Sequence, residues 1–337
     1  VLEYDGAFWR RIPVPGTTFL YGLSVGSDDI IYVGGIGQIG MIRDNESGGK
    51  AFTSLIEHLP PEELPFIEEI WEVNATDQGV FFGGDTKVLR WKDGHLDVFA
   101  PDTDSVIFDC WSGSRYFVQG IGHGLFTIVG DRLEPVSRHR VFREETVCAM
   151  LDWEDGSFLV ATKSDGLYLL RPNGLEPFVT EVDTFIRDKV LNKVIALSSG
   201  NLALGTFHGG VAVVDRGGRF VRLLDESTGL PNQTMVHLAE DREGGLWCSL
   251  GSGLARINLR SPISFFDQSN GLRSVLVWSM ERHDGVLHLG TNSGLFRLNR
   301  PEEQPGRAIF ESVPGMQGEV AALISLPDGL LAAIDEE

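Results

Sequence analysis

Two histidines at equivalent positions are the first residues of the sequence to weigh for chemistry. His123 and His208 each follow a strand-like segment that ends in small residues. Imidazole is the commonest metal ligand in proteins and titrates near neutral pH, so such a pair could bind a metal ion or transfer protons. A metal site needs at least a third ligand, and Gln38 is the only other residue of similar use in an equivalent loop. We therefore interpret both histidines as polar loop residues, and we expect no metal and no other cofactor.

Other patterns of catalytic residues are missing from the sequence. It contains no G-x-S-x-G nucleophile elbow, no H-E-x-x-H zinc motif, no P-loop and no dinucleotide-binding fingerprint. Cys110, Cys148 and Cys248 stand singly in apolar segments, which is typical of buried thiols and not of zinc ligands or disulfides. We therefore expect no catalytic residue.

The charge balance excludes several classes of partner. The sequence has 48 acidic and 28 basic residues, which gives a net charge of −20. Nucleic acids are bound by basic surfaces, so nucleic acid and anionic lipid are poor partners for this chain. No run of 18 apolar residues is present, so we expect no part of this chain to lie in a membrane. Without an initiator Met or a signal peptide, Val1 is interpreted as the edge of a piece of a longer protein.

A repeat runs through the whole sequence and sets where the loops fall. Each unit reads as a short apolar strand, a turn with Asp or Gly, a second strand that ends in a small residue, and two further strands around another turn. A period close to 42 residues with four short strands is typical of a β-propeller blade. We expect the small residues to let neighbouring blades approach each other. They are Gly34, Gly84, Gly120, Ala161, Gly205, Ser249, Gly290 and Ala333.

The two ends of the chain read as two halves of one repeat. Residues 327–337 followed by residues 1–6 rebuild the unit seen at 154–170. We therefore predict one all-β domain over 1–337, a β-propeller of four-stranded antiparallel blades whose closing blade combines about 1–13 with 319–337. Eight blades are favoured, and seven blades with an unpaired half-blade at each end are the alternative. Segment 44–66 is predicted as a helical insertion, because Leu55, Ile56 and Leu59 are at helical spacing before two prolines.

The repeat resembles that of the two-component regulator propeller family. The resemblance is strongest at Gly229-Leu230-Pro231-Asn232, at Gly244-Gly245-Leu246-Trp247 and at Gly253-Leu254-Ala255-Arg256, and residues 270–298 repeat the pattern. Residues 1–43 are similar to the opening of that family's sensor regions. The resemblance implies a non-catalytic, extracytoplasmic and therefore periplasmic sensor of a membrane-bound signalling protein, whose output is a histidine kinase, a diguanylate cyclase or a DNA-binding regulator. It also implies a usual ring of seven blades.

Two sets of loops are expected to form a ligand-binding face. One set leads into the innermost strand of each blade, and the other joins the second strand to the third. Their side chains differ from blade to blade on a constant framework, which suits a rigid scaffold with variable binding groups. We predict a small molecule as ligand, with a glycan fragment favoured. The candidate binding residues are Gln38, Asp85, His123, Lys163, His208, Asn232, Ser252, Asn270, Arg273 and Asn292.

Two other functions remain open on the sequence. A propeller-fold polysaccharide lyase or hydrolase would need ionisable groups that converge, and the candidates are His123, His208, Lys163 and Asp85. A protein docking platform, including a homodimer of the full-length protein, would need a contiguous apolar patch. We interpret Trp71, Trp247 and Trp278 as core aromatics, since all three fall in strand columns.

Overall fold

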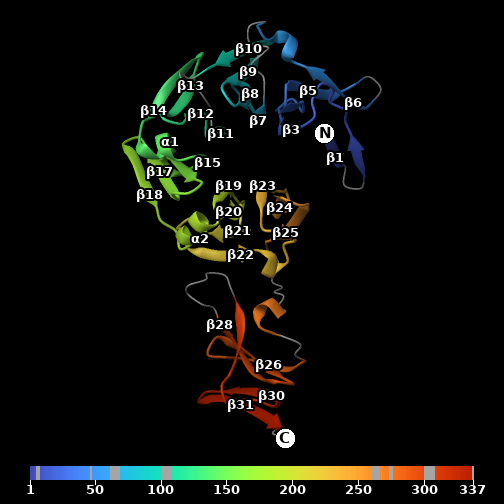
Figure 1. Cartoon of the computed structure of the whole chain (residues 1–337), viewed down its shortest axis with the longest axis vertical. Coiled ribbons are helices and arrows are strands. Elements are labelled where there is room, and N and C mark those ends of the chain that lie inside the picture. Colours follow the sequence, from blue (N-terminus) through green and yellow to red (C-terminus); the bar gives the residue numbers. More distant parts are fainter. Residues whose placement is uncertain are drawn as a thin grey trace. The chain divides into compact units, whose positions relative to one another are not determined.

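The computed structural model describes residues 1–4, 8–45, 48–60, 69–100, 108–259, 266, 268–272, 276–299 and 308–335. The chain divides into two compact units, Val1–Pro177 and Phe178–Glu337. In both units each sheet is an antiparallel meander of consecutive strands (Figure 1). This arrangement confirms the all-β prediction, and the four-stranded sheets are the blades of a β-propeller.

The first unit contains one hairpin and four four-stranded blades. Its strands are β1 (Leu2–Tyr4), β2 (Trp9–Arg11), β3 (Leu20–Val25), β4 (Ile31–Gly35), β5 (Gln38–Asp44), β6 (Lys50–Ser54), β7 (Ile70–Thr76), β8 (Gly79–Gly84), β9 (Val88–Lys92), β10 (His95–Phe99), β11 (Phe108–Ser112), β12 (Arg115–Gly120), β13 (Gly124–Val129), β14 (Arg132–Ser137), β15 (Val147–Asp152), β16 (Phe158–Thr162), β17 (Leu167–Arg171) and β18 (Gly174–Phe178). Neighbouring blades pack through their first strands, with β3 against β7, β7 against β11 and β11 against β15.

Among the described residues, the second unit contains two four-stranded blades, one three-stranded blade and one hairpin. Its strands are β19 (Leu191–Ala196), β20 (Leu202–Thr206), β21 (Val211–Val214), β22 (Phe220–Leu224), β23 (Met235–Glu240), β24 (Gly245–Leu250), β25 (Leu254–Asn258), β26 (Val277–His283), β27 (Val286–Thr291), β28 (Gly294–Asn299), β29 (Ile309–Ser312), β30 (Glu319–Leu326) and β31 (Gly329–Asp335). Here β19 contacts β23, and β26 contacts β30.

Helices are few and short. Over the described residues they are η1 (Ile56–His58), α1 (Arg140–Glu144), η3 (Glu154–Gly156), α2 (Asp183–Asp188), η4 (Glu226–Thr228) and η5 (Gln268–Asn270). In segment 44–66, where a helical insertion was expected, the helical part is limited to η1. Residues 50–54 form β6, the outer strand of the first blade, and residues 61–66 lie outside the described residues. Leu55 and Leu59, which flank η1, are buried.

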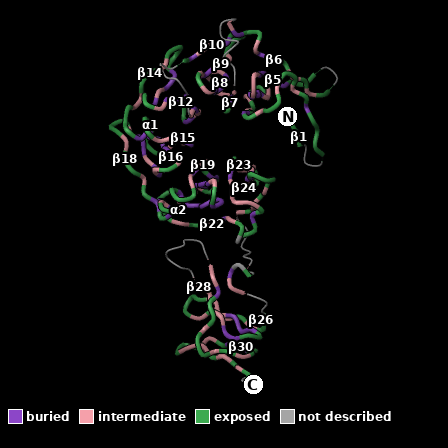
Figure 2. The backbone as a smooth tube through the Cα atoms, in the orientation of Figure 1, coloured by how far each residue is buried: buried purple, intermediate pink, exposed green. Residues whose placement is uncertain are grey.

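The core lies between blades. The second strand β8 is buried from Val80 to Gly84, because its blade lies between the β3–β6 and β11–β14 blades of the same unit and both of its faces are covered (Figure 2). The small residues allow this approach: a Cβ added to Gly34 would lie 2.4 Å from Ile70 Cγ2, and one added to Gly205 would lie 2.9 Å from Leu238 Cδ1. The prediction that small residues let blades converge is therefore confirmed at these positions.

Two of the predicted small-residue positions are shifted by one residue. The strand register makes Gly83 and Gln119 the equivalents of Gly34, where the sequence repeat indicated Gly84 and Gly120. Both errors have the same cause, since a glycine directly follows the equivalent residue and the spacing alone cannot choose between the two. At Gln119 the side chain is buried, so a small residue is not required in every blade.

A β-bulge recurs at the same place in seven first strands. In each, one residue near the start of the strand is skipped in the pairing with the second strand, as between Leu20 and Gly22 of β3. Such an extra residue turns its side chain out of the regular alternation. The skipped residues are Tyr21, Trp71, Cys148, Asn192, Val236, Trp278 and Ala321.

Each end of the chain forms a two-stranded hairpin. β1 pairs with β2, with Tyr4 opposite Trp9, and β30 pairs with β31, with Ala322 opposite Ala333. The two hairpins belong to different units. Their union in one closing blade, and with it the count of eight blades, stays a prediction.

Candidate ligand-binding face

The two predicted loop sets meet at the same end of the blades. A main-chain hydrogen bond ties the turn after the second strand to the residue two positions before the bulge, as from Ile36 N to Phe19 O (3.1 Å) and from Lys163 N to Thr146 O (2.9 Å). The second unit repeats this bond from Phe207 N, Gly251 N and Asn292 N to Val190 O, Thr234 O and Leu276 O. The bulge residues therefore lie beside both loop sets, and we call this end of the blades the loop face.

Threonines at the end of the second strand hold the turns of the loop face. The Thr162 hydroxyl donates to Gly166 O (2.8 Å), Thr206 to Gly210 O (3.1 Å) and Thr291 to Gly294 O (2.8 Å). All three threonines are buried, so these bonds satisfy hydroxyl groups that water does not reach. A small residue followed by Thr in the repeat thus fixes the main chain of the turn and leaves the turn side chains variable.

The loop face of the first unit carries three aromatic side chains next to a carboxylate. Tyr21 stacks on Trp71 with ring centroids 4.4 Å apart, and Phe19 lies nearly parallel to Tyr21 at 6.4 Å. The Trp71 indole donates from Nε1 to Asp85 Oδ1 (2.6 Å). The rings are 62% (Phe19), 41% (Tyr21) and 46% (Trp71) exposed. We call these four residues the aromatic shelf.

The predicted binding residues of the first unit divide into buried and accessible ones. Gln38 is buried, donates to Pro15 O (3.1 Å) and accepts from the Ser54 hydroxyl (2.8 Å), so its amide serves the fold. Asp85 belongs to the aromatic shelf. His123 is exposed in the turn between β12 and β13, and Lys163 is half-buried in the turn between β16 and β17.

The second unit places most of its predicted residues in turns of the loop face. His208, Ser252 and Asn292 are exposed, and Asn292 Oδ1 accepts from Leu276 N (2.8 Å). Asn232 is half-buried and accepts from Thr234 N (2.8 Å). Asn270 is buried beside β29 and donates to Ala308 O (2.9 Å). Arg273 lies outside the described residues.

The interpretation of all three strand tryptophans as core is wrong for two of them. Trp71 and Trp278 are bulge residues, and about half of each side chain is exposed. Trp247 is half-buried on β24. The signal in the sequence is an apolar pair in a first strand, such as Ile70-Trp71, where alternation would place a polar residue.

A second tryptophan–carboxylate pair lies in the turn between β23 and β24. Asp241 accepts from Trp247 Nε1 (2.9 Å), from Arg256 Nε (2.7 Å) and from the main-chain nitrogens of Glu243 (2.9 Å) and Gly245 (2.8 Å). Arg256, followed by Gly245 N and Trp247, holds the pKa of Asp241 well below its usual value. This network explains why the repeat combines these residue types: they build a turn.

A third aromatic–carboxylate pair is fully enclosed. The Tyr116 hydroxyl donates to Asp109 Oδ2, and both side chains are buried. Burial, followed by the negative charge of Asp109, raises the pKa of Tyr116 well above its usual value. The carboxylate packs on Gly83, where an added Cβ would lie 2.0 Å from Asp109 Oδ1.

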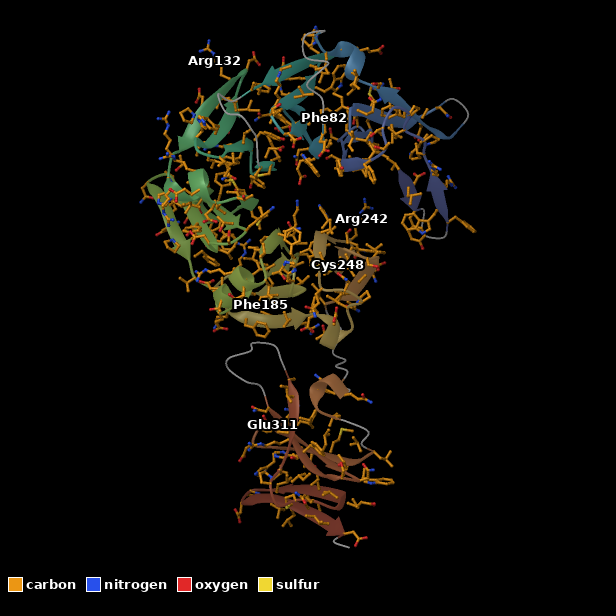
Figure 3. The ribbon with its side chains drawn as sticks, in the orientation of Figure 1. Phe82, Arg132, Phe185, Arg242, Cys248 and Glu311 are labelled. Atoms are coloured by element: carbon orange, nitrogen blue, oxygen red, sulfur yellow. The ribbon has the colours of Figure 1, made fainter. Side chains whose placement is uncertain are left out.

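Cys248, which lies within the β23–β25 sheet (Figure 3), is also enclosed, and burial raises the pKa of its thiol to about 11.

A pocket of about 430 Å³ lies in the first unit between the β1–β2 hairpin and β3. Its lining combines apolar side chains, such as Leu2, Ile12 and Leu23, with polar ones such as Arg11 and Thr17. Phe19 and Tyr21 of the aromatic shelf also border it.

Over the described part of the chain, no three His, Cys, Asp or Glu side chains come together in a way that suits a metal ion. None of the described helices has the length and apolar character needed to cross a bilayer.

Comparison with known proteins identifies the fold. No family profile and no curated protein matches the sequence. The chain is similar to the WD40 β-propeller domain of Doa1 (14% identity, TM-score 0.58, 77% of this chain and 86% of that chain). It is also similar to virginiamycin B lyase from Staphylococcus aureus (10% identity, TM-score 0.52, 94% and 92%). At these identities the likeness establishes a β-propeller and no activity.

The solved structures similar to this chain also include the extracellular domain of BT4673 from B. thetaiotaomicron, which is named as a one component system (13% identity, TM-score 0.44). That alignment covers 97% of this chain and 61% of that chain, so this chain spans less than two thirds of that domain.

Proposed function

We propose that this chain is the ligand-binding propeller of an extracytoplasmic sensor in a membrane-bound signalling protein. It binds a small molecule of the glycan type on its loop face and catalyses no reaction. The bulge series carries the proposal: seven first strands share one main-chain deviation, yet the side chains presented there range from Trp to Ala. A constant backbone with variable side chains at one end is the arrangement of a recognition surface.

The sequence repeat supports the sensor assignment. The segment around Asp241, Trp247 and Arg256 resembles the two-component regulator propeller repeat, and in the structure those residues have an architectural role in one turn. The periplasm is the compartment in which such a sensor meets its ligand. The side chains of the loop face, which the repeat leaves variable, then distinguish one sensor from another.

A thermal-shift screen tests the function. The chain is heated with oligosaccharides, amino acids and divalent cations in turn, and a ligand at 100 times its dissociation constant should stabilise it by about 2.7 kcal/mol. We expect a sugar to stabilise the chain and to be recovered intact by chromatography afterwards. Cleavage of the sugar would replace the sensor by the lyase or hydrolase alternative, and stabilisation by a divalent cation alone would contradict the glycan assignment.

A further inference from the structure

We propose that the aromatic shelf binds a neutral hexopyranose unit, whose apolar ring face packs on the exposed aromatic surface while one of its hydroxyl groups donates to Asp85. This assignment rests on the proposed function and names its binding site. It concerns the first unit alone, because Phe19, Tyr21, Trp71 and Asp85 all belong to two adjacent blades, β3–β6 and β7–β10.

The exposure of the shelf is the first reason. Large aromatic side chains are mostly buried in folded proteins, and exposed groups of them mark binding sites. Here three neighbouring rings, arranged in a stack, are between 41% and 62% exposed. Tyr21 and Trp71 lie on the successive first strands β3 and β7, and Phe19 directly precedes β3. By contrast Cys148, the bulge residue of β15, is buried and directs its thiol to Ala161 O (3.5 Å). The bulge therefore does not by itself force a side chain into solvent.

The shelf is also held in place before any ligand arrives. The indole of Trp71 is oriented by Asp85, and Tyr21 is held against it by the close approach of β3 to β7. Gly22 permits that approach, since an added Cβ would lie 2.7 Å from Val73 Cγ2. Phe19 is fixed through its carbonyl, which accepts from Ile36 N (3.1 Å) and from the Thr17 hydroxyl (2.8 Å). A site ordered in advance loses little conformational entropy on binding.

The geometry and charge of the shelf select the ligand class. Tyr21 and Trp71 stack on each other with 25° between their planes, so each ring covers one face of the other and the two do not stand as the separate walls of a cage for a cation. The part of each ring that stays exposed is available to a ligand. Asp85 adds an acceptor at the edge of that surface, and acceptors of this kind bind hydroxyl donors. The carboxylate and the net charge of −20 oppose anionic ligands. A neutral sugar ring, apolar on its face and rich in hydroxyl groups at its rim, meets all three conditions.

The experiment measures binding of three hexopyranose oligosaccharides, maltopentaose, cellopentaose and mannopentaose, by titration calorimetry and by tryptophan fluorescence. Xylopentaose is the pentopyranose probe, and tighter binding of it than of the other three would overturn the hexopyranose assignment. Tetramethylammonium and a trigalacturonate are the cationic and anionic probes. We expect Trp71→Ala to weaken binding of the best neutral sugar by about tenfold or more, and Asp85→Asn by about threefold. Trp247→Phe, a change at the tryptophan outside the loop face, is the matched control and should stay within about twofold of the parent. Urea denaturation confirms that each variant is folded.

The outcomes separate the shelf from the function. A sugar that binds equally well to the parent and to Trp71→Ala overturns the shelf and leaves the sensor proposal standing. The shelf is likewise overturned if tetramethylammonium or trigalacturonate binds more tightly than the neutral sugars. If amino acids bind in the thermal-shift screen and no sugar does, the shelf and the glycan assignment both fail, and only the sensor role of the chain stands. If no member of the whole panel binds, both proposals fail. Loss of the fluorescence change in Trp71→Phe, with the other tryptophans in place, would locate the sugar at the shelf directly.

Discussion

Two tryptophans make the same hydrogen bond in different surroundings. Trp71 donates to Asp85 (2.6 Å) at the loop face of the first unit, and Trp247 donates to Asp241 (2.9 Å) in a turn of the second unit. Asp241 also accepts from Arg256 and from two main-chain nitrogens, and the Arg256 guanidinium lies 6.0 Å from the centre of the Trp247 ring. Every part of that pair is used within the turn.

Asp85 accepts fewer hydrogen bonds than Asp241. Among the interactions of the described residues, the indole of Trp71 is the only hydrogen-bond donor to its carboxylate. The other difference is exposure, since Trp71 is 46% exposed whereas Trp247 is half-buried under Arg256. The comparison teaches that the tryptophan in the recognisable repeat motif serves the architecture. The tryptophan outside the motif, placed by a bulge, is the one available to a ligand.

Ring closure is the strongest test of this comparison. Leu23 and Val25 of β3 are exposed beside the shelf. If the ring closes, the closing blade should cover Leu23 and Val25 and should leave the shelf, with Trp71, accessible to solvent. In the predicted closing blade Ala332 of β31 would pair with Leu2 of β1, as Phe82 pairs with Leu89 in a complete blade. We expect Leu2→Cys with Ala332→Cys to form a disulfide, which should raise the free energy of unfolding in urea by about 5 kcal/mol.

A shift by one residue supplies the control for that cross-link. Glu3→Cys with Ala332→Cys should remain reduced, because neighbouring residues of a strand point to opposite faces. Peptide mapping identifies the bridge. Closure would be wrong if the two pairs oxidise equally. If the cross-link shields Trp71 from acrylamide quenching, Trp71 is not available to a ligand and the difference between Trp71 and Trp247 disappears.

The enclosed pair Tyr116–Asp109 gives the next largest effect. Tyr116→Phe keeps the ring and removes one buried hydrogen bond to the Asp109 carboxylate, so we expect a loss of about 2 kcal/mol of unfolding free energy in urea. Burial and Asp109 raise the pKa of Tyr116 above its unfolded value. The parent should therefore lose stability as the pH rises above about 10, and the variant should lose less. If Tyr116→Phe changes neither the free energy of unfolding nor its decrease above about pH 10, the Tyr116–Asp109 hydrogen bond does not stabilise the fold.

The two tryptophans themselves give smaller effects. Trp247→Phe removes one donor from the Asp241 network and should cost about 1 kcal/mol of unfolding free energy. Trp71→Phe should cost less than about 0.5 kcal/mol, because its ring is half exposed and its carboxylate partner remains solvated. Urea denaturation of both variants measures the difference. Equal losses would mean that Trp71 is a packing residue, and the distinction between the pairs would disappear.

Much of the fold is predictable from the sequence because the close approach of neighbouring backbones requires small residues at a fixed period. Gly34, Gly205 and Gly290 recur because a Cβ would collide with the next blade, and that need leaves a mark at a fixed period. β6 was missed because Lys50–Ser54 alternates weakly on an outer edge and stands beside an apolar run at helical spacing. The position of an outer strand is fixed by pairing with its neighbour, which spacing does not reveal.

The site was predictable only in outline. The two predicted loop sets do lie at one end of the blades, since the turn positions follow from the repeat, and the binding of a ligand at that end stays a prediction. Gln38 and Asn270 were predicted to bind a ligand, yet both are buried and bonded within the chain, because a polar residue in a turn satisfies main-chain groups as readily as it meets solvent. Tyr21 was missed because a bulge inserts one residue into a strand, and its effect on side-chain direction appears only in the register.

The smallest expected effect is the acid sensitivity of the architectural pair. Arg256, Gly245 N and Trp247 lower the pKa of Asp241, so this carboxylate binds a proton more readily in the unfolded chain than in the folded one. Its contribution to stability is present above the unfolded value of about 4 and is lost as the pH falls below it. Solvent screens the turn, so the loss is modest. We expect urea midpoints between pH 6 and pH 3 to fall further for the parent than for Asp241→Asn. Parallel curves would show that Asp241 is no more committed to the fold than Asp85, and the architectural half of the comparison would fail.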